Sequence, residues 1–212
     1  MNEILNYNES NVKMKKRKEI LDKSINIFIR EGIHPVKMGD IAKECGISLR
    51  SLYYYYPNKE YLAVDIQILC MSAFTQIIND FDHFSNVNYD KFTNYLDTIY
   101  DIIEKNQKNI KFITAFDYYF YNSYPNEKYT NFLKTKLTNN FIFSNSNSNP
   151  HDNSIDFLGE DPNLLFTTII QSMLAYAQKI IYREKAMLSE DVESRGELRI
   201  YLKLIKNAIK KR

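Results

Sequence analysis

The chain has 212 residues, of which 44% are hydrophobic and 14% aromatic, enough to bury one large core or two smaller ones. Only five glycines and five prolines are present, which favours helices and argues against the many turns of a β fold. No apolar run approaches the roughly 18 residues of a membrane span, so we expect no membrane partner.

The start of the chain is polar, and no secretory signal peptide is visible there. The two cysteines, Cys45 and Cys70, stand in unrelated segments and do not indicate a disulfide framework. Both observations favour a cytoplasmic protein. The net charge is only +2, but residues 1–62 hold 11 basic and 8 acidic side chains, a net +3, so a polyanion is expected to bind there.

Residues 1–12 are polar, and we expect them to be disordered. A first helix is predicted over about 13–31, with an apolar face around Ile20 and Phe28. Lys13 and residues 15–18 are basic, and at the start of a helix they oppose its dipole. They form either a solvated face or an arm that touches phosphates.

Residues 41–59, IAKECGISLRSLYYYYPNK, predict two short helices joined by a tight turn. Gly46 ends the first of them, because glycine readily adopts the left-handed conformation at a helix terminus. Ser48 is suited to cap the second helix, and Ile47 can pack on Leu52 across this cap.

The second of these helices can be divided by face. At about 100° per residue, Leu52 and Tyr56 point to the core, while Arg50 and Tyr54 lie on the opposite side. Four consecutive tyrosines cannot all be buried on so short a helix. They form either a locally sticky surface or a row of rings and hydroxyls directed at nucleic acid, and we favour the second interpretation.

Residues 17–62 resemble the N-terminal domain of the TetR family of bacterial transcriptional regulators. The matching residues are Ile20-Leu21, Phe28, Gly32, Asp40-Ile41-Ala42, Gly46-Ile47-Ser48, Leu52-Tyr53, Tyr56 and Lys59-Glu60. The chain departs from the family at Val36, where a capping Thr or Ser is usual. It also departs at Leu49, where many members have Lys, and at Arg50, where many have Gly.

The resemblance implies an all-α fold in two parts. An N-terminal three-helix helix-turn-helix DNA-binding domain (1–60) precedes a larger helical ligand-binding and dimerisation domain (61–212). The partner is then a double-stranded DNA operator, with Arg50 and Ser51 at base edges. The expected DNA-binding residues are Lys37, Leu49, Arg50, Ser51, Tyr53, Tyr54, Tyr55 and Lys59. Asp40 is expected to have a structural role.

Beyond residue 59 the sequence predicts helices only. The first runs without Gly or Pro to about residue 84, long enough to pass from the first domain into the second. Further helices are expected at 88–106, 109–121, 127–143, 162–183 and 195–210, and the polar residues 144–154 are expected to form an exposed loop.

The last two of these helices carry broad apolar stripes. Such stripes either pack within the chain or, as in the TetR family, form a four-helix interface between two subunits. We favour a homodimer with two-fold symmetry.

No catalytic or metal-binding motif is visible. The three histidines are isolated, no spacing typical of a metal site exists, and no phosphate loop or nucleophile motif is present. We therefore expect neither an enzyme, nor a metal site, nor a cofactor.

Residues 92–133 are rich in Phe and Tyr. This aromatic segment forms either ordinary core or the wall of a ligand pocket, and the resemblance favours the pocket. Asp117 lies within it and is either exposed or directed inward to a cationic ligand. The predicted ligand-binding residues are Tyr95, Ile99, Phe112, Phe116, Asp117, Tyr119, Met173 and Tyr176, for a small lipophilic or aromatic inducer of unknown identity.

Three functions remain open. The first is a DNA-binding transcriptional regulator, a repressor released from a palindromic operator by an inducer. The second keeps the DNA binding, but the C-terminal domain serves protein–protein assembly. The third is a small helical enzyme or ligand carrier, for which the sequence offers no catalytic cluster. We favour the first, although the sequence names neither operator nor inducer and does not separate repressor from activator.

Overall fold

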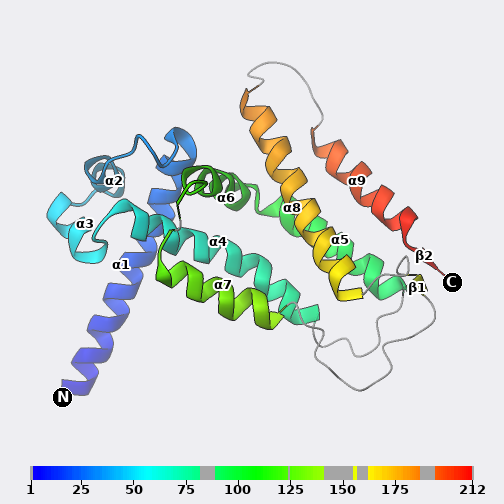
Figure 1. Ribbon diagram of the computed structural model, residues 1–212. Helices are drawn as coiled ribbons and strands as arrows, with labels where there is room; N and C mark the ends of the chain where they lie inside the picture. Colours follow the sequence, from blue (N-terminus) through cyan, green and yellow to red (C-terminus); the bar gives the residue numbers. More distant parts are fainter. Residues whose placement is uncertain are drawn as a thin grey trace. The chain divides into compact units, whose positions relative to one another are not determined.

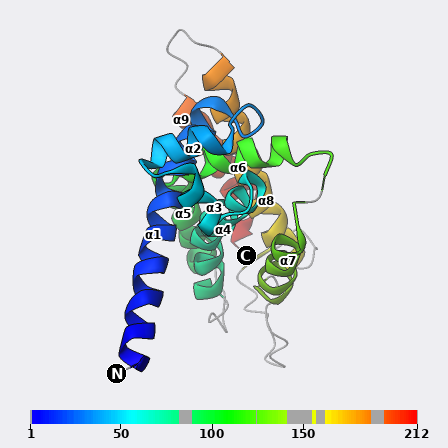
Figure 2. The same cartoon turned by 90° about the vertical axis from the view of Figure 1, so that its left-hand side faces the viewer.

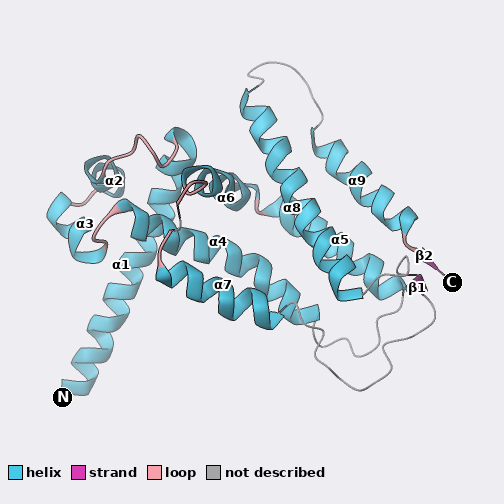
Figure 3. Cartoon of the chain, in the orientation of Figure 1, coloured by secondary structure: helices cyan, strands magenta, loops and turns pink. Residues whose placement is uncertain are grey.

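The computed structural model describes residues 2–81, 89–123, 125–140, 155–156, 162–186 and 194–211. These residues are almost entirely helical, which confirms the predicted all-α fold (Figure 1; Figure 3). The helices are α1 (Asn2–Glu31), α2 (Met38–Cys45), α3 (Leu49–Tyr55), α4 (Lys59–Phe81), α5 (Tyr89–Lys105), α6 (Gln107–Tyr119), α7 (Glu127–Asn140), α8 (Pro162–Ala186) and α9 (Ser194–Ala208).

Two strands of two residues each were not expected from the sequence. They are β1 (Ile155–Asp156) and β2 (Lys210–Lys211), which pair antiparallel, with Ile155 opposite Lys211. The predicted loop at 144–154 lies outside the described residues.

The chain divides into two compact units. Unit 1 joins Met1–Cys70 with Ala115–Thr130, and unit 2 joins Met71–Thr114 with Asn131–Arg212. This division differs from the boundary expected at residue 60. Unit 1 includes the first half of α4 and the corner between α6 and α7. Asp65 of α4 pairs with Arg17 of α1 and with Lys128 of α7.

Helix α1 begins at Asn2, and the disorder expected for residues 1–12 stays a prediction. No Gly or Pro interrupts the first 31 residues, and adding residues to a helix that is already formed costs little. In Figures 1 and 2 the N-terminal half of α1 projects past α2 and α3. The basic residues 13–18 therefore lie in mid-helix, where the helix dipole does not oppose them.

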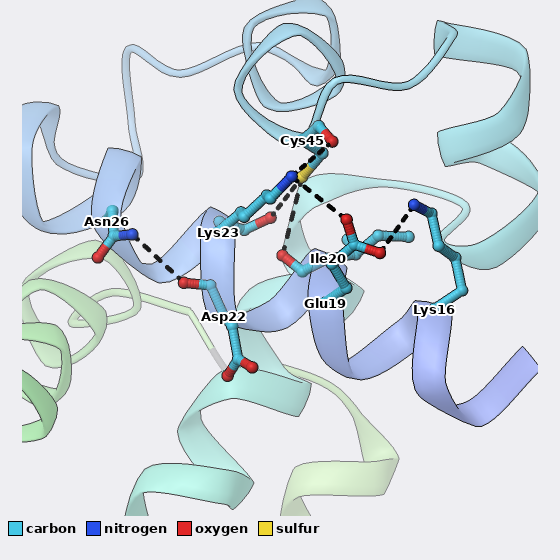
Figure 4. A network of polar contacts seen from close by, with 8 residues as sticks. Lys16, Glu19, Ile20, Asp22, Lys23, Asn26 and Cys45 are labelled. Atoms are coloured by element: carbon cyan, nitrogen blue, oxygen red, sulfur yellow. Dashed lines mark hydrogen bonds and ion pairs between the residues drawn. The ribbon is translucent and has the colours of Figure 1, made fainter. Parts of the chain in front are cut away.

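Helices α1 and α2 meet around Cys45, which is buried and free (Figure 4). Its thiol donates to the carbonyl oxygen of Ile20 at 3.8 Å and lies 3.7 Å from the hydroxyl of Ser24. The Lys23 ammonium donates to the Cys45 carbonyl at 3.2 Å and thus satisfies one of the free carbonyls at the end of α2. These contacts fix the first helix of the motif on α1.

The turn between α2 and α3 has the geometry that the sequence predicts. Gly46 has φ +67° and ψ 35°, the left-handed conformation. The Ser48 hydroxyl accepts from the backbone N–H of Ser51 at 3.1 Å and so caps α3. Leu52 is fully buried and Tyr56 almost so, which confirms the predicted core face of α3.

The start of α2 compensates for the missing hydroxyl at Val36. The Asp40 carboxylate accepts from the backbone N–H of Lys37 at 2.9 Å, which confirms a structural role for Asp40. Val36 itself is buried and contributes apolar area instead.

Unit 2 has its core where α5, α8 and α9 pack together (Figure 1). Helix α5 buries the five residues expected from its periodicity, Phe92, Tyr95, Leu96, Ile99 and Ile103. Helix α8 begins at Pro162 as predicted. Its apolar stripe, which includes Met173, packs in one cluster with residues of α5 and with Leu202 of α9. Part of each stripe packs within the chain, and an interface between two subunits stays a prediction. In the described part of the chain, none of the helices is both long enough and apolar enough to span a bilayer.

Candidate nucleic-acid interface

Helix α3 presents one continuous exposed face. Leu52 and, just beyond the helix, Tyr56 hold it to the core, and the side chains that point away are exposed. The exposed set is Leu49, Arg50, Ser51, Tyr53 and Tyr54, while Tyr55 is half-buried. The structure thus brings six of the eight predicted DNA-binding residues onto a single short helix.

Arg50 is the cation of this face, and its charge is available to a binding partner. Its guanidinium is exposed and makes no hydrogen bond or ion pair with any residue that the structure describes. Ser51 is less available, because its hydroxyl shares a hydrogen bond of 2.8 Å with the Ser48 hydroxyl at the helix cap. Arg50 is therefore the stronger candidate for reading a base edge.

The tyrosines add rings and hydroxyls beside Arg50. Tyr54 is 68% exposed and meets Tyr55 edge to face, with ring centroids 5.1 Å apart. Tyr53 is half-exposed on the flank. Lys37 is exposed at the N-terminus of α2, next to backbone N–H groups that favour anions.

Lys59 has a different environment from the one expected of a phosphate contact. Its ammonium donates to the carbonyl oxygens of Ile33, His34 and Val36 at 2.8, 2.7 and 3.0 Å. All three N–H bonds are thus used within the protein, and burial lowers the pKa of Lys59. The contact joins the start of α4 to the turn between α1 and α2, so Lys59 orders that turn rather than offering a free charge.

Tyr119 was expected in a ligand pocket, but it contacts the start of α4. Its hydroxyl donates to the Glu60 carboxylate at 2.6 Å, and the Lys59 ammonium lies 5.4 Å from its ring centre. Burial, together with this hydrogen bond, raises the pKa of Tyr119 to about 12. The end of α6 is thereby tied to the start of α4 within unit 1.

Asp65 was missed by the sequence analysis. Its carboxylate is only 12% exposed, and it accepts from Arg17 of α1 at 2.8 Å and from Lys128 of α7. A carboxylate so poorly hydrated is costly unless cations pair with it. The partners are 48 and 63 residues away in the chain, so no local pattern could have indicated this junction.

The predicted ligand-binding residues fall in both units. Tyr95, Ile99 and Met173 are buried in the core of unit 2, where Tyr176 packs against them. Phe112 is buried on the part of α6 that belongs to unit 2. Phe116, Asp117 and Tyr119 belong to unit 1. Asp117 is exposed, so the inward orientation considered for it is wrong.

Gln67 was also missed, and it is a buried polar side chain in unit 1. Its amide nitrogen lies 3.3 Å from the Tyr129 hydroxyl, and its amide oxygen has no hydrogen-bond partner among the described residues. Rotating the amide by 180° would only exchange the atom that lacks a partner. Tyr129 in turn packs edge to face on Phe116, with ring centroids 5.2 Å apart.

Comparison with known proteins agrees with this geometry. Residues 20–66 match the family model described as "Bacterial regulatory proteins, tetR family". The chain is 41% identical over 56 residues to the HTH-type transcriptional regulator RutR of Escherichia coli K12, which is 26% of each chain. It spans only about a quarter of the length of the curated relatives that it matches.

Two solved structures share the fold over nearly the whole chain. A TetR family transcription regulator from Marinobacter aquaeolei VT8 superposes with a TM-score of 0.61 at 14% identity, covering 97% of this chain and 100% of that one. The ketosteroid transcriptional regulator KstR2 of Mycobacterium tuberculosis gives 0.57 at 15% identity, covering 92% and 95%. At such low identity these likenesses establish the fold alone.

Replacing Lys59 tests its structural role. We expect Lys59→Met to lower the free energy of unfolding by about 1–3 kcal/mol, because three carbonyl oxygens lose their donor. Thermal or urea unfolding measures the change, with Lys43→Met, at an exposed position on α2, as the control. A Lys59→Met protein as stable as the control would contradict the role in ordering the turn.

Proposed function

We propose, from the membership of this chain in the TetR family of bacterial regulatory proteins, that it binds a double-stranded DNA operator and regulates transcription. The finer proposal is a cytoplasmic homodimeric repressor that a small molecule releases from DNA. The observation that supports DNA binding most strongly is the exposed face of α3, with the uncommitted Arg50 at its centre.

The exposed face suits the major groove of B-DNA, which is wide enough to admit a helix. Arg50 stands in the first turn of α3, and its planar guanidinium can donate two parallel hydrogen bonds to a guanine. Tyr53 and Tyr54 lie on the same helix, and Lys37 is exposed at the start of α2. All three are suited to phosphate oxygens, which position the protein without reading sequence.

Replacing Arg50 tests the base-reading role. We expect Arg50→Ala to weaken binding to the cognate site by about 1–3 kcal/mol and to relax specificity at one position of each half-site. Gel-shift titrations compare the DNA upstream of the gene with a random duplex. Lys111→Ala removes the same charge from an exposed position on α6 and serves as the control. An equal loss on both duplexes would show that Arg50 contacts only the backbone.

A homodimer is supported by apolar residues that unit 2 leaves uncovered. Ile200 and Leu204 stand one turn apart on α9 and are each 61% exposed, although the opposite face of α9 is buried. A two-fold partner would cover the same residues on both subunits. Two recognition helices related in this way call for a palindromic operator, with half-sites about 34–36 Å apart.

A charge on this face should separate the subunits. We expect Leu204→Asp to give a folded monomer in light scattering, since the side chain is exposed within one chain but would carry a buried, unpaired charge in a dimer. Arg199→Asp, on the other flank of α9, should leave the dimer intact. A dimeric Leu204→Asp protein would move the interface elsewhere.

The proposal of an inducer rests on the aromatic surroundings of Gln67. Phe116 and Tyr129 supply apolar area, and the unpaired amide atom of Gln67 is suited to one hydrogen bond from a ligand. The ligand must prefer one arrangement of the DNA-binding helices, because equal affinity for both would shift nothing.

Replacing Gln67 tests the inducer site. A thermal-shift screen of lipophilic and aromatic compounds identifies a ligand, and we expect that ligand to release DNA from the wild-type protein. Gln67→Leu removes the unpaired polar atom together with the hydrogen bond to Tyr129, and these two effects on stability oppose each other. It should retain DNA binding, yet should lose at least tenfold in affinity for the ligand. Phe116→Trp should likewise block release. If no compound stabilises the protein, the inducer proposal fails, and the alternative that the C-terminal domain (61–212) serves protein–protein assembly is favoured.

A further inference from the structure

The basic residues of α1 differ in whether an acid neutralises them. Lys16 pairs with Glu19 at 2.8 Å (Figure 4), and Arg17 pairs with Asp65 at the same distance. Lys13 is exposed, and it has no acidic partner among the described side chains. Among the side chains that the structure describes, its charge is therefore not neutralised.

Three basic side chains of α1 run alongside three consecutive tyrosines. The Lys13 ammonium lies 5.0 Å from the ring centre of Tyr54, and the Arg17 guanidinium lies 4.9 Å from that of Tyr56. Between them, the pKa of Lys16 is raised mainly by its hydrogen bond to Glu19 and, to a lesser degree, by Tyr55. We call this arrangement the lysine–tyrosine row; it consists of Lys13, Lys16 and Arg17 with Tyr54, Tyr55 and Tyr56, and it brings α1 beside α3.

The two ends of the lysine–tyrosine row differ in burial. Tyr56 is buried, so Arg17 contributes there to the core of unit 1. Tyr54 is 68% exposed on the face of α3 that carries Arg50, so Lys13 adds its charge to that face. The described side chains next to Lys13, Val12 and Met14, are exposed as well.

Folding alone does not account for a lysine at this position. A cation over an exposed aromatic ring contributes about 0.5–1 kcal/mol. Like charges three and four residues apart on a helix oppose this by about 0.2–0.5 kcal/mol each, as Lys16 and Arg17 do, while the opposite charge of Glu9, four residues before Lys13, offsets one of them by a similar amount. The net gain is small, whereas an uncompensated cation beside a DNA-binding face attracts phosphate strongly.

We propose that Lys13 is an accessory contact to a DNA phosphate and that the Tyr54 ring holds it beside α3. The inference rests on the proposed DNA binding and adds α1 to the interface. A single ammonium on a flexible stem acts as a point charge, so the contact is with the backbone and not with a base. It should strengthen binding to all sequences alike.

The salt dependence of binding to a random 30-base-pair duplex tests the contact. Each phosphate contact contributes about 0.9 to the slope of log K against log salt, which is roughly eightfold in affinity at 0.1 M salt. We expect Lys13→Gln to lose this amount per subunit. Lys15→Gln removes the same charge from the opposite side of α1, two residues on, and should leave the slope unchanged.

A double-mutant cycle tests the part played by Tyr54. If the ring holds the lysine, Lys13→Gln should have little further effect in a Tyr54→Leu background, and the two losses should not add. Full additivity would overturn the role of Tyr54. Equal slopes for wild type, Lys13→Gln and Lys15→Gln would overturn the phosphate contact while leaving the proposed function standing. A wild-type protein that binds neither duplex would instead overturn the proposed function.

Discussion

The packing of unit 1 depends on one poorly hydrated carboxylate that requires cationic partners. Asp65 lies on α4 with little exposure to water, and two cations, Arg17 and Lys128, pair with it from α1 and α7. Arg17 pairs with one carboxylate oxygen and Lys128 with the other, so losing either cation would leave one poorly hydrated oxygen without that partner. Three segments that are distant in sequence are therefore held around one residue of α4, and the orientation of α1 follows from that.

The position of the recognition helix follows from α1 and α4 in turn. Leu52 and Tyr56 fix α3 against the core, the Arg17 guanidinium lies over the Tyr56 ring, and Lys59 orders the turn before α2. Few side chains on the exposed face of α3 contribute to packing or capping within the protein. That separation explains how a helix of seven residues can be held firmly and still keep Arg50 free for a partner.

The corner between α6 and α7 belongs to unit 1, because Tyr119, Lys128 and Tyr129 all bond to side chains of α4. Helix α4 itself continues from unit 1 into unit 2 without a break. A ligand bound near Gln67 would thus act on contacts that orient α1 and α4, within the same unit as α3. Such a site needs only a small difference in affinity between two arrangements to bias DNA binding.

The sequence by itself determined the helices, the turn at Gly46, the cap at Ser48 and the two faces of α3, because periodicity and local backbone chemistry act over a few residues. It also indicated the core of α5 and the start of α8 at Pro162. Only the tertiary structure decided that the Lys59 ammonium donates to three carbonyl oxygens, that Asp117 faces solvent, and that Tyr119 bonds to Glu60. The partners of Lys59 and Tyr119 come from distant parts of the chain, and the exposure of Asp117 depends on which face of α6 is packed. No pattern within one helix could specify any of the three.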